Sequence, residues 1–293
     1  SSLANKLGLS EDKPFPTTIQ TDGLAEIMLD AIENLKEPLS QKRILHWHSC
    51  LFPDGYTLLN PIIGGQLRGS HPMQVVSGRI DRPVIHFEAP GREILDEELN
   101  AFITWFNDSK EDTALDPLIR AAICHLWFVT LHPLDDGNGR ITRLLTDLAL
   151  AQAEQQSVRF YAMSVGILAN RKRYYEVLET TQKGGLDITP WLSWFLEILN
   201  ETFADVLCGI DETLFKTNYW LRIDQTKLTS EQVKVLNRML DGDFEDGINT
   251  SQYHKVAKVS KATATRHLSA LVDGGCLVKS EAGGRSTRYL LAR

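Results

Sequence analysis

The sequence predicts a mainly α-helical protein with two domains, and three observations support this. Over most of residues 1–225, apolar residues recur at three- and four-residue spacings, which is typical of amphipathic helices. The charge balance changes along the chain: residues 1–225 carry 20 basic and 31 acidic residues, whereas residues 226–293 carry 11 and 7. A length of 293 residues fits two domains of ordinary size. We therefore expect one domain over 1–225, with a core at about 40–183, and a second over 226–293.

Composition excludes several classes of protein. Hydrophobic residues make up 43% of the chain and charged residues 24%, which excludes a largely disordered or collagen-like chain. No apolar run approaches the ~20 residues needed to cross a bilayer, and no signal-peptide pattern is visible, so no membrane partner is expected. The four cysteines lie far apart without a Cys-x-x-Cys pair, which favours a reducing cytoplasmic location.

Most elements of the first domain are predicted as helices from the spacing of their apolar residues. They cover 21–35, 39–50, 93–106, 117–131, 139–153, 171–182 and 189–221. The helix at 117–131 is apolar nearly all round, so we expect it in the middle of a bundle. Two short β-branched runs, 73–78 and 83–87, predict a small β-hairpin that ends at Ala89-Pro90-Gly91.

A polar, glycine-rich segment follows the most apolar helix and combines several chemically useful groups. It reads His132-Pro133-Leu134-Asp135-Asp136-Gly137-Asn138-Gly139-Arg140. Pro133 favours the end of the helix after His132, and Asn138 is expected to cap the next helix. The start of that helix and Arg140 suit a phosphate, Asp136 suits Mg²⁺, and His132 can accept a proton near neutral pH. The segment therefore predicts nucleotide-transfer chemistry.

This segment resembles the signature of the Fic family, His-Pro-Phe-x-Asp-Gly-Asn-Gly-Arg. It departs at Leu134, where the family usually has Phe and where we expect an apolar side chain in the core. The resemblance extends over about residues 20–200. It implies a Fic-type helical bundle with a small β-hairpin flap and a protein adenylyltransferase that moves AMP from ATP to a Ser, Thr or Tyr hydroxyl of a target protein.

The resemblance also implies roles for individual residues. His132 is expected to deprotonate the target hydroxyl, Asp136 to hold Mg²⁺, and Arg140 to grip the terminal phosphate. The remaining expected nucleotide contacts are Gly137, Asn138 and Gly139 in the anion hole, then Arg143, Tyr174 and Tyr175. The hairpin, with Gln74, Val75, Val76, His86 and Phe87, is expected to dock a target segment by strand addition. The other histidines show no convincing metal-ligand spacing, and His46 and His48 are interpreted as structural.

Many Fic proteins also carry an inhibitory helix with the pattern [Ser/Thr]-x-x-x-Glu-[Gly/Asn]. Here only Glu33-Asn34 matches its end, and Leu29 stands where Ser or Thr is needed. We expect the inhibitory segment to lie upstream of Ser1 in a longer natural chain.

The second domain is predicted to be a winged helix-turn-helix. Helices are expected at 230–240, 251–258 and 261–273, strands at 276–279 and 286–290, and a wing tip at Gly283-Gly284-Arg285. If the third helix reads DNA, the contacts would be Lys261, Thr263, Thr265, Arg266 and Arg285. Docking of a protein or formation of a homodimer stays open.

Other functions also stay open. One alternative is a nucleotide-sensing, DNA-binding regulator without transferase activity. Another is a Fic enzyme that transfers a different group, or one that removes AMP. The absence of Gly-x-x-x-x-Gly-Lys and Gly-x-Gly-x-x-Gly patterns argues against a P-loop or Rossmann nucleotide site.

Overall fold

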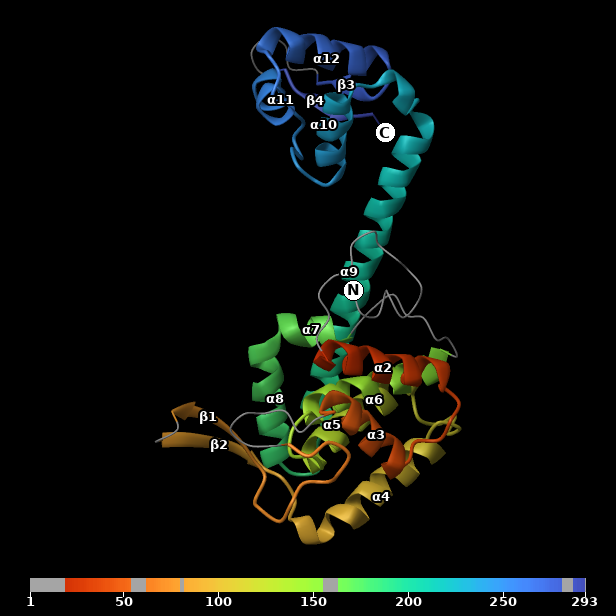
Figure 1. Cartoon of the computed structure of the whole chain (residues 1–293), viewed down its shortest axis with the longest axis vertical. Helices are drawn as coiled ribbons and strands as arrows, with labels where there is room; N and C mark the ends of the chain where they lie inside the picture. Colours follow the sequence, from red (N-terminus) through yellow and green to blue (C-terminus); the bar gives the residue numbers. More distant parts are fainter. Residues whose placement is uncertain (1–18, 54–61, 80–81, 155–162, 281–286, 293) are drawn as a thin grey trace. The chain divides into compact units, whose positions relative to one another are not determined.

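The chain is mainly helical, as predicted, and it divides into two compact units after Ala204. The computed structural model describes residues 19–53, 62–79, 82–154, 163–280 and 287–292 (Figure 1). The division falls within the long helix α9 (Thr189–Arg222). The expected domain boundary after residue 225 stays a prediction. Within the described residues, no helix combines the length and apolar content needed to cross a membrane.

The first unit contains the predicted helices, each within a few residues of its expected bounds. They are α2 (Ile19–Glu33), α3 (Gln41–Leu51), α4 (Arg92–Asp108), α5 (Pro117–Leu131), α6 (Asn138–Glu154), α8 (Arg171–Lys183) and the start of α9. A further short helix, α7 (Met163–Ala169), was not predicted, because seven residues are too few to show a helical period.

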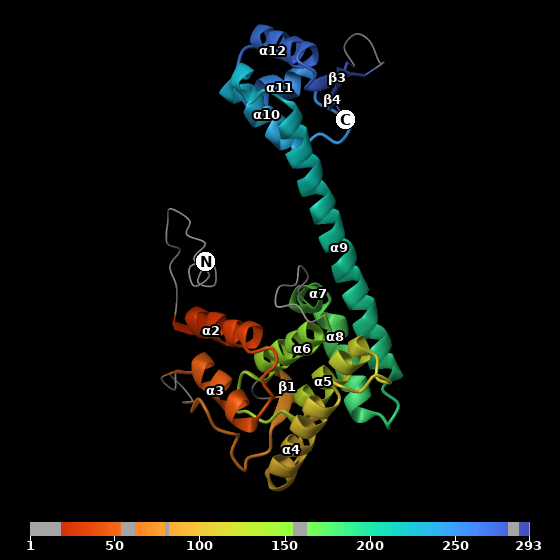
Figure 2. The same ribbon diagram turned by 90° about the vertical axis from the view of Figure 1, so that its right-hand side faces the viewer.

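Helix α5 lies at the centre of this unit, where it packs against α4 and α6 (Figure 2). Its start is well defined: Pro117 occupies the first turn, and the Asp116 carboxylate accepts hydrogen bonds from the backbone N–H groups of Leu118 and Ile119 at 2.8 and 3.2 Å. Its buried side chains lie on several faces, including Phe128, which packs on Phe102 of α4. The prediction of a central helix is confirmed.

The predicted hairpin is present as β1 (Gln74–Arg79) and β2 (Arg82–Glu88), which pair antiparallel in a two-stranded sheet. The register shifts between Val75 and Val76, which is a β-bulge. Figure 1 shows the hairpin beside α8, extending away from the helical body.

The second unit contains three further helices followed by two short strands. They are α10 (Ser230–Leu240), α11 (Thr250–Ala257), α12 (Lys261–Asp273), β3 (Leu277–Lys279) and β4 (Tyr289–Leu291), preceded by the 3₁₀ turn η1 (Gln225–Lys227). This order of elements matches the expectation, and the assignment as a winged helix stays a prediction. The last strand begins at Tyr289, three residues later than expected. Arg288 donates its backbone N–H to the Ser280 hydroxyl instead of to a strand carbonyl.

Candidate active site

His132 ends helix α5 in a strained conformation, and one nitrogen of its imidazole ring is left without a proton. Its backbone is left-handed, with φ 47° and ψ 54°, and its N–H still bonds to the Phe128 carbonyl at 3.1 Å. The ring Nδ1 lies 3.1 Å from the Val129 carbonyl oxygen. Because a carbonyl only accepts, Nδ1 carries the proton and Nε2 keeps the lone pair. Burial lowers the pKa of His132 below its ordinary value, so the imidazole is neutral at pH 7.

Arg68 fixes the segment that carries His132, although nothing in the sequence pattern pointed to it. Its side chain is 2% exposed, and its Nε donates to the carbonyl oxygen of His132 at 2.9 Å. The Arg68 backbone N–H donates to the Pro133 carbonyl at 3.0 Å, and the guanidinium also donates to the carbonyl of Pro90. Arg68 therefore holds the loop after α5 against the chain that leaves the hairpin.

The role predicted for Asn138 as a helix cap is wrong, because the structure gives its side chain another task. Asn138 is the first residue of α6 and is buried. Its side-chain oxygen accepts the N–H of Leu134 at 3.0 Å, and its amide donates to the Leu134 carbonyl at 2.7 Å. These two bonds close the loop between the helices. Leu134 itself is fully buried, as expected from its position in the motif.

Gly137 allows the loop to lie directly against the end of helix α3. Its φ of 82° is left-handed, and a Cβ atom there would lie 3.0 Å from the Phe52 ring. Its carbonyl accepts the first backbone bonds of α6, from Arg140 and Ile141, both at 3.0 Å. The start of α6 is therefore placed directly after the loop, and the N–H groups of its first turn have no acceptor within the helix apart from the Gly137 carbonyl.

Asp136 and Arg140 form the polar edge of this loop. The Asp136 carboxylate accepts the Gly137 N–H at 2.5 Å and lies 3.6 Å from an Arg140 guanidinium nitrogen. The Arg140 guanidinium also stacks over the Phe52 ring at 4.8 Å. Asp136 is about half exposed, and its second carboxylate oxygen lies beside the Arg140 cation. One half-exposed carboxylate is a ligand that Mg²⁺ commonly uses, together with substrate oxygens and water.

A pocket of about 690 Å³ lies between the hairpin, the loop and helix α8. That volume suits a nucleotide-sized ligand. Ten of the predicted site residues line it: His132, Gly139, Arg143, Tyr174, Tyr175, Gln74, Val75, Val76, His86 and Phe87. Asp136, Gly137, Asn138 and Arg140 do not line this pocket; they lie in the same loop as His132. Asp135, to which the sequence assigned no role, does line it.

The hairpin is attached to the rest of the pocket through α8. The His86 ring lies 2.7 Å from a carboxylate oxygen of Glu179, which also pairs with Lys183 at 2.6 Å. On the hairpin itself, Val76 and Ile85 are about half exposed. The hairpin thus combines an apolar surface with the outer edges of a two-stranded sheet, which can pair with another strand.

A buried chain of hydrogen bonds joins the loop to the pocket wall, and His125 lies at its centre. The Thr142 hydroxyl donates to the Asn138 carbonyl, and the Thr146 hydroxyl donates to the Thr142 carbonyl, at 2.7 and 2.8 Å. The Thr146 oxygen therefore accepts from His125 Nδ1 at 2.9 Å, and His125 Nε2 accepts from the Tyr174 hydroxyl at 3.1 Å.

Burial lowers the pKa of His125 to about 3, so this histidine stays neutral. Tyr174 is buried, whereas the neighbouring Tyr175 is about half exposed. Tyr174 therefore faces the pocket with its ring while its hydroxyl is engaged by His125. The sequence held no sign of His125 beyond its place in an apolar helix.

In the second unit, the residues proposed to touch DNA lie on the outer face of α12. Lys261, Thr265 and Arg266 are exposed, and Thr263 is partly buried, whereas Ala264, Leu268 and Leu271 are buried in the core. Two hydroxyls already have local partners: Thr265 donates to the Lys261 carbonyl, and Thr263 bonds to the Ser260 hydroxyl. Arg285 lies outside the described residues.

The loop and its surrounding helices are similar to a known protein family. Residues 38–150 match the model of the Fic/DOC family. Two similar curated proteins are a protein adenylyltransferase Fic from Aedes aegypti, 31% identical over 154 residues, and one from Nematostella vectensis, 32% identical over 143 residues. A third is the protein adenylyltransferase fic-1 from Caenorhabditis elegans, 28% identical over 180 residues.

These alignments cover only part of each protein. They include 53%, 48% and 61% of this chain and 27%, 31% and 31% of the respective relatives, so the chain spans about a third of their length. Among solved structures, a Fic family protein from Desulfovibrio desulfuricans G20 aligns with 99% of this chain and 80% of its own, at 18% identity and a TM-score of 0.50. That likeness concerns the fold alone.

Proposed function

We propose that this chain, whose residues 38–150 form a Fic/DOC family domain, is a protein adenylyltransferase that uses ATP. The names of the similar proteins support the reaction class. The observation that carries the proposal is the state of His132, because a neutral imidazole with Nδ1 bonded to a carbonyl has Nε2 available as a base beside the pocket.

The transfer needs one bond formed and one broken. The oxygen of a Ser, Thr or Tyr hydroxyl attacks the α-phosphorus of ATP, and its proton passes to Nε2 of His132. The bond from the α-phosphorus to the bridging oxygen breaks, and pyrophosphate leaves. The start of α6, with Gly137, Asn138 and Gly139, and the guanidinium of Arg140 would hold the phosphates.

Mg²⁺ fits the donor set of this loop, and Asp136 would hold it. The half-exposed carboxylate of Asp136 and the oxygens of the triphosphate are ligands of the type this ion prefers. When bound, the ion would offset the negative charge of the triphosphate. Arg143, Tyr174 and Tyr175 line the pocket beyond the loop and are proposed as further nucleotide contacts.

The hairpin is proposed to dock the target protein. Strand addition at its outer edge would bring a target side chain to the pocket, where Gln74, Val75 and Val76 on β1 and His86 and Phe87 on β2 form one wall.

The test is self-modification followed by intact mass measurement. Wild type incubated with ATP and Mg²⁺ should gain the mass of one or more AMP groups, whereas His132→Ala and Asp136→Ala should gain none. An increment that persists in His132→Ala would refute the assigned base. If wild type gains nothing, the same incubation with a cell extract and labelled ATP tests for transfer to other proteins.

Transfer of a different group, and removal of AMP, would use the same loop. The mass increment separates the first from AMP transfer, and incubation with an AMP-modified protein tests the second.

A second candidate, a nucleotide-sensing DNA-binding regulator, is favoured by one observation: the exposed face of α12 carries Lys261 and Arg266. Binding to duplex DNA that weakens with salt, without any transferase activity, would support it.

A further inference from the structure

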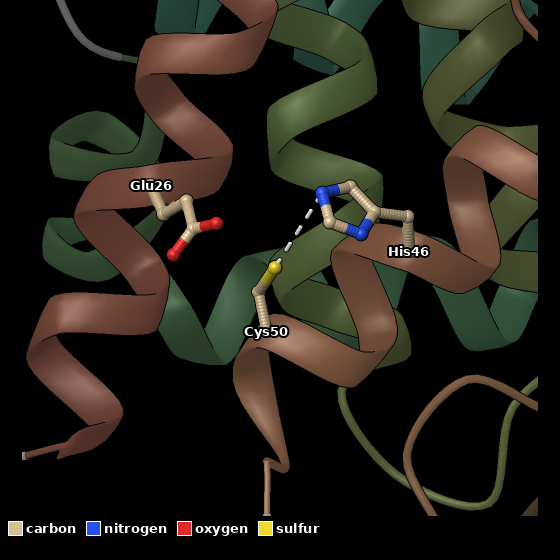
Figure 3. Close-up of side chains that lie close together, drawn as sticks. All are labelled: Glu26, His46 and Cys50. Atoms are coloured by element: carbon tan, nitrogen blue, oxygen red, sulfur yellow. Dashed lines mark hydrogen bonds between the residues drawn. The ribbon is translucent and has the colours of Figure 1, made fainter.

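Helices α2 and α3 bring three metal-binding side chains together on the surface of the first unit, away from the pocket. Glu26 extends from α2, and His46 and Cys50 extend from successive turns of α3 (Figure 3). One donor atom of each lies within 4.8 Å of the others, and Cys50 Sγ is 3.8 Å from His46 Nε2. We propose that Glu26, His46 and Cys50 form a binding site for Zn²⁺.

The chemistry of the donors selects the ion. A thiolate, an imidazole and a carboxylate are ligands that Zn²⁺ takes together in proteins, whereas Mg²⁺ and Ca²⁺ prefer oxygen alone. Zinc bonds of about 2.3 Å to sulfur and 2.0–2.1 Å to nitrogen place tetrahedral donors about 3.5 Å apart. The sulfur-to-nitrogen distance of 3.8 Å is close to that value before any adjustment. Three protein ligands leave a fourth position for water or another ligand.

The backbone places the three residues where a metal can join them. His46 and Cys50 are four residues apart, so their side chains share one face of α3. Glu26 reaches them because α2 approaches α3 unusually closely at Gly23, where a Cβ atom would lie only 1.8 Å from the Cys50 carbonyl oxygen. Glu26, one turn further along α2, then faces Cys50. From the sequence, His46 was interpreted as structural, because its partner Glu26 lies on another helix and only the fold brings the two together.

The same helix pair is already held further along by Asp30. Its carboxylate accepts hydrogen bonds from Arg43 Nε at 2.9 Å and from Trp47 Nε1 at 2.7 Å. The helices are therefore in position without the metal, so binding does not require them to assemble first. Glu26 and His46 are exposed and Cys50 is partly exposed, which gives an ion direct access from solvent.

Titration of the full chain with Zn²⁺ and with Co²⁺ tests the site. Wild type should bind one equivalent of Zn²⁺ at micromolar or lower concentration. The Co²⁺ form should show a thiolate-to-cobalt charge-transfer band, which requires a bound cysteine. Zn²⁺ should raise the thermal midpoint, because the ion binds the folded chain.

Three variants and two controls complete the experiment. Cys50→Ser should abolish the charge-transfer band, and His46→Ala and Glu26→Gln should each weaken Zn²⁺ binding by at least about tenfold. Cys208→Ser and His71→Ala, which change an exposed cysteine and an exposed histidine elsewhere, should behave as wild type. Circular dichroism confirms that each variant is folded. Binding only at millimolar Zn²⁺, or a charge-transfer band that survives Cys50→Ser, would overturn the proposal.

Discussion

Arg68 donates a hydrogen bond from its Nε to the carbonyl oxygen of His132 at 2.9 Å, and both residues lie on segments far apart in the sequence. The same arginine binds the carbonyls of Pro133 and Pro90. The Arg68 side chain thus links the end of α5 to the chain that leaves the hairpin, and its backbone N–H adds a bond to the loop at Pro133.

Replacement of Arg68 by Ala is expected to leave the partly buried carbonyls of His132 and Pro90 without this donor. A hydrogen bond to a charged group contributes about 1.5–3 kcal/mol, so we expect the free energy of unfolding to fall by about 3 kcal/mol. Urea unfolding measures this change. Arg92→Ala is the matched control, because Arg92 forms an exposed ion pair with Asp96 and should cost less than about 1 kcal/mol. Equal losses in the two variants would contradict the role of Arg68.

The rate of AMP transfer should depend on pH through His132. Burial holds the pKa of this histidine below its ordinary value, and the base must be unprotonated. The rate should therefore be steady above pH 6.5 and fall as the pH drops through the lowered pKa. Initial rates from pH 5 to 8 measure the profile. His132→Ala should lower the rate by roughly 100-fold or more at pH 7.5. A wild-type rate that still changes with pH above pH 7 would contradict the assignment.

Stability should fall in acid because of His125. Its pKa is about 3 in the folded chain, against 6.5 as the ordinary value, so the unfolded chain binds the extra proton between these limits. The contribution of this group to the free energy of unfolding is complete above pH 6.5. It is lost as the pH falls toward 3, by up to about 1.4 kcal/mol for each pH unit.

His125→Gln should therefore flatten the pH dependence of the unfolding free energy between pH 7 and 5, measured by urea unfolding. The exposed His71→Gln is the control and should leave the slope unchanged. A slope in His125→Gln equal to that of wild type would show that other groups cause the acid sensitivity.

Gly137→Ala should weaken both stability and transfer. The substitution forces a left-handed residue to carry a Cβ atom 3.0 Å from Phe52, which costs about 1–3 kcal/mol. Thermal unfolding and the self-modification assay measure the two effects. Gly185→Ala is the control, since no atom lies within 4 Å of the added Cβ atom. If Gly137→Ala changes neither stability nor transfer, the loop can adopt another position.

If α12 binds DNA, the double variant Lys261→Ala with Arg266→Ala should weaken binding and reduce the slope of log affinity against log salt by about 2. Fluorescence anisotropy with duplex DNA at several salt concentrations measures the slope. Lys227→Ala with Lys234→Ala removes the same charge elsewhere and is the control. Identical curves for the two double variants would exclude α12 as the DNA contact.

The helices and the loop motif were predictable because their signals are local. Helical spacing identified α5, α10 and α12 to the residue, and the hairpin followed from its β-branched runs. His132, Asp136 and Arg140 were singled out because nine consecutive residues match a family signature at all but one position. Turns and helix caps were harder to predict. Asn138 is a residue type that often caps helices, but its buried side chain hydrogen-bonds to the backbone of Leu134 instead.

The sequence by itself determined the mainly helical class, the Fic resemblance and the candidate base. Only the tertiary structure decided which distant residues support them: Arg68 on the His132 carbonyl, His125 on the Tyr174 hydroxyl, and Glu26 beside Cys50. The reason is physical. Periodicity and turn chemistry depend on residues that are neighbours in the chain. These contacts instead join distant segments that tertiary packing brings together, so no local sequence pattern predicts them.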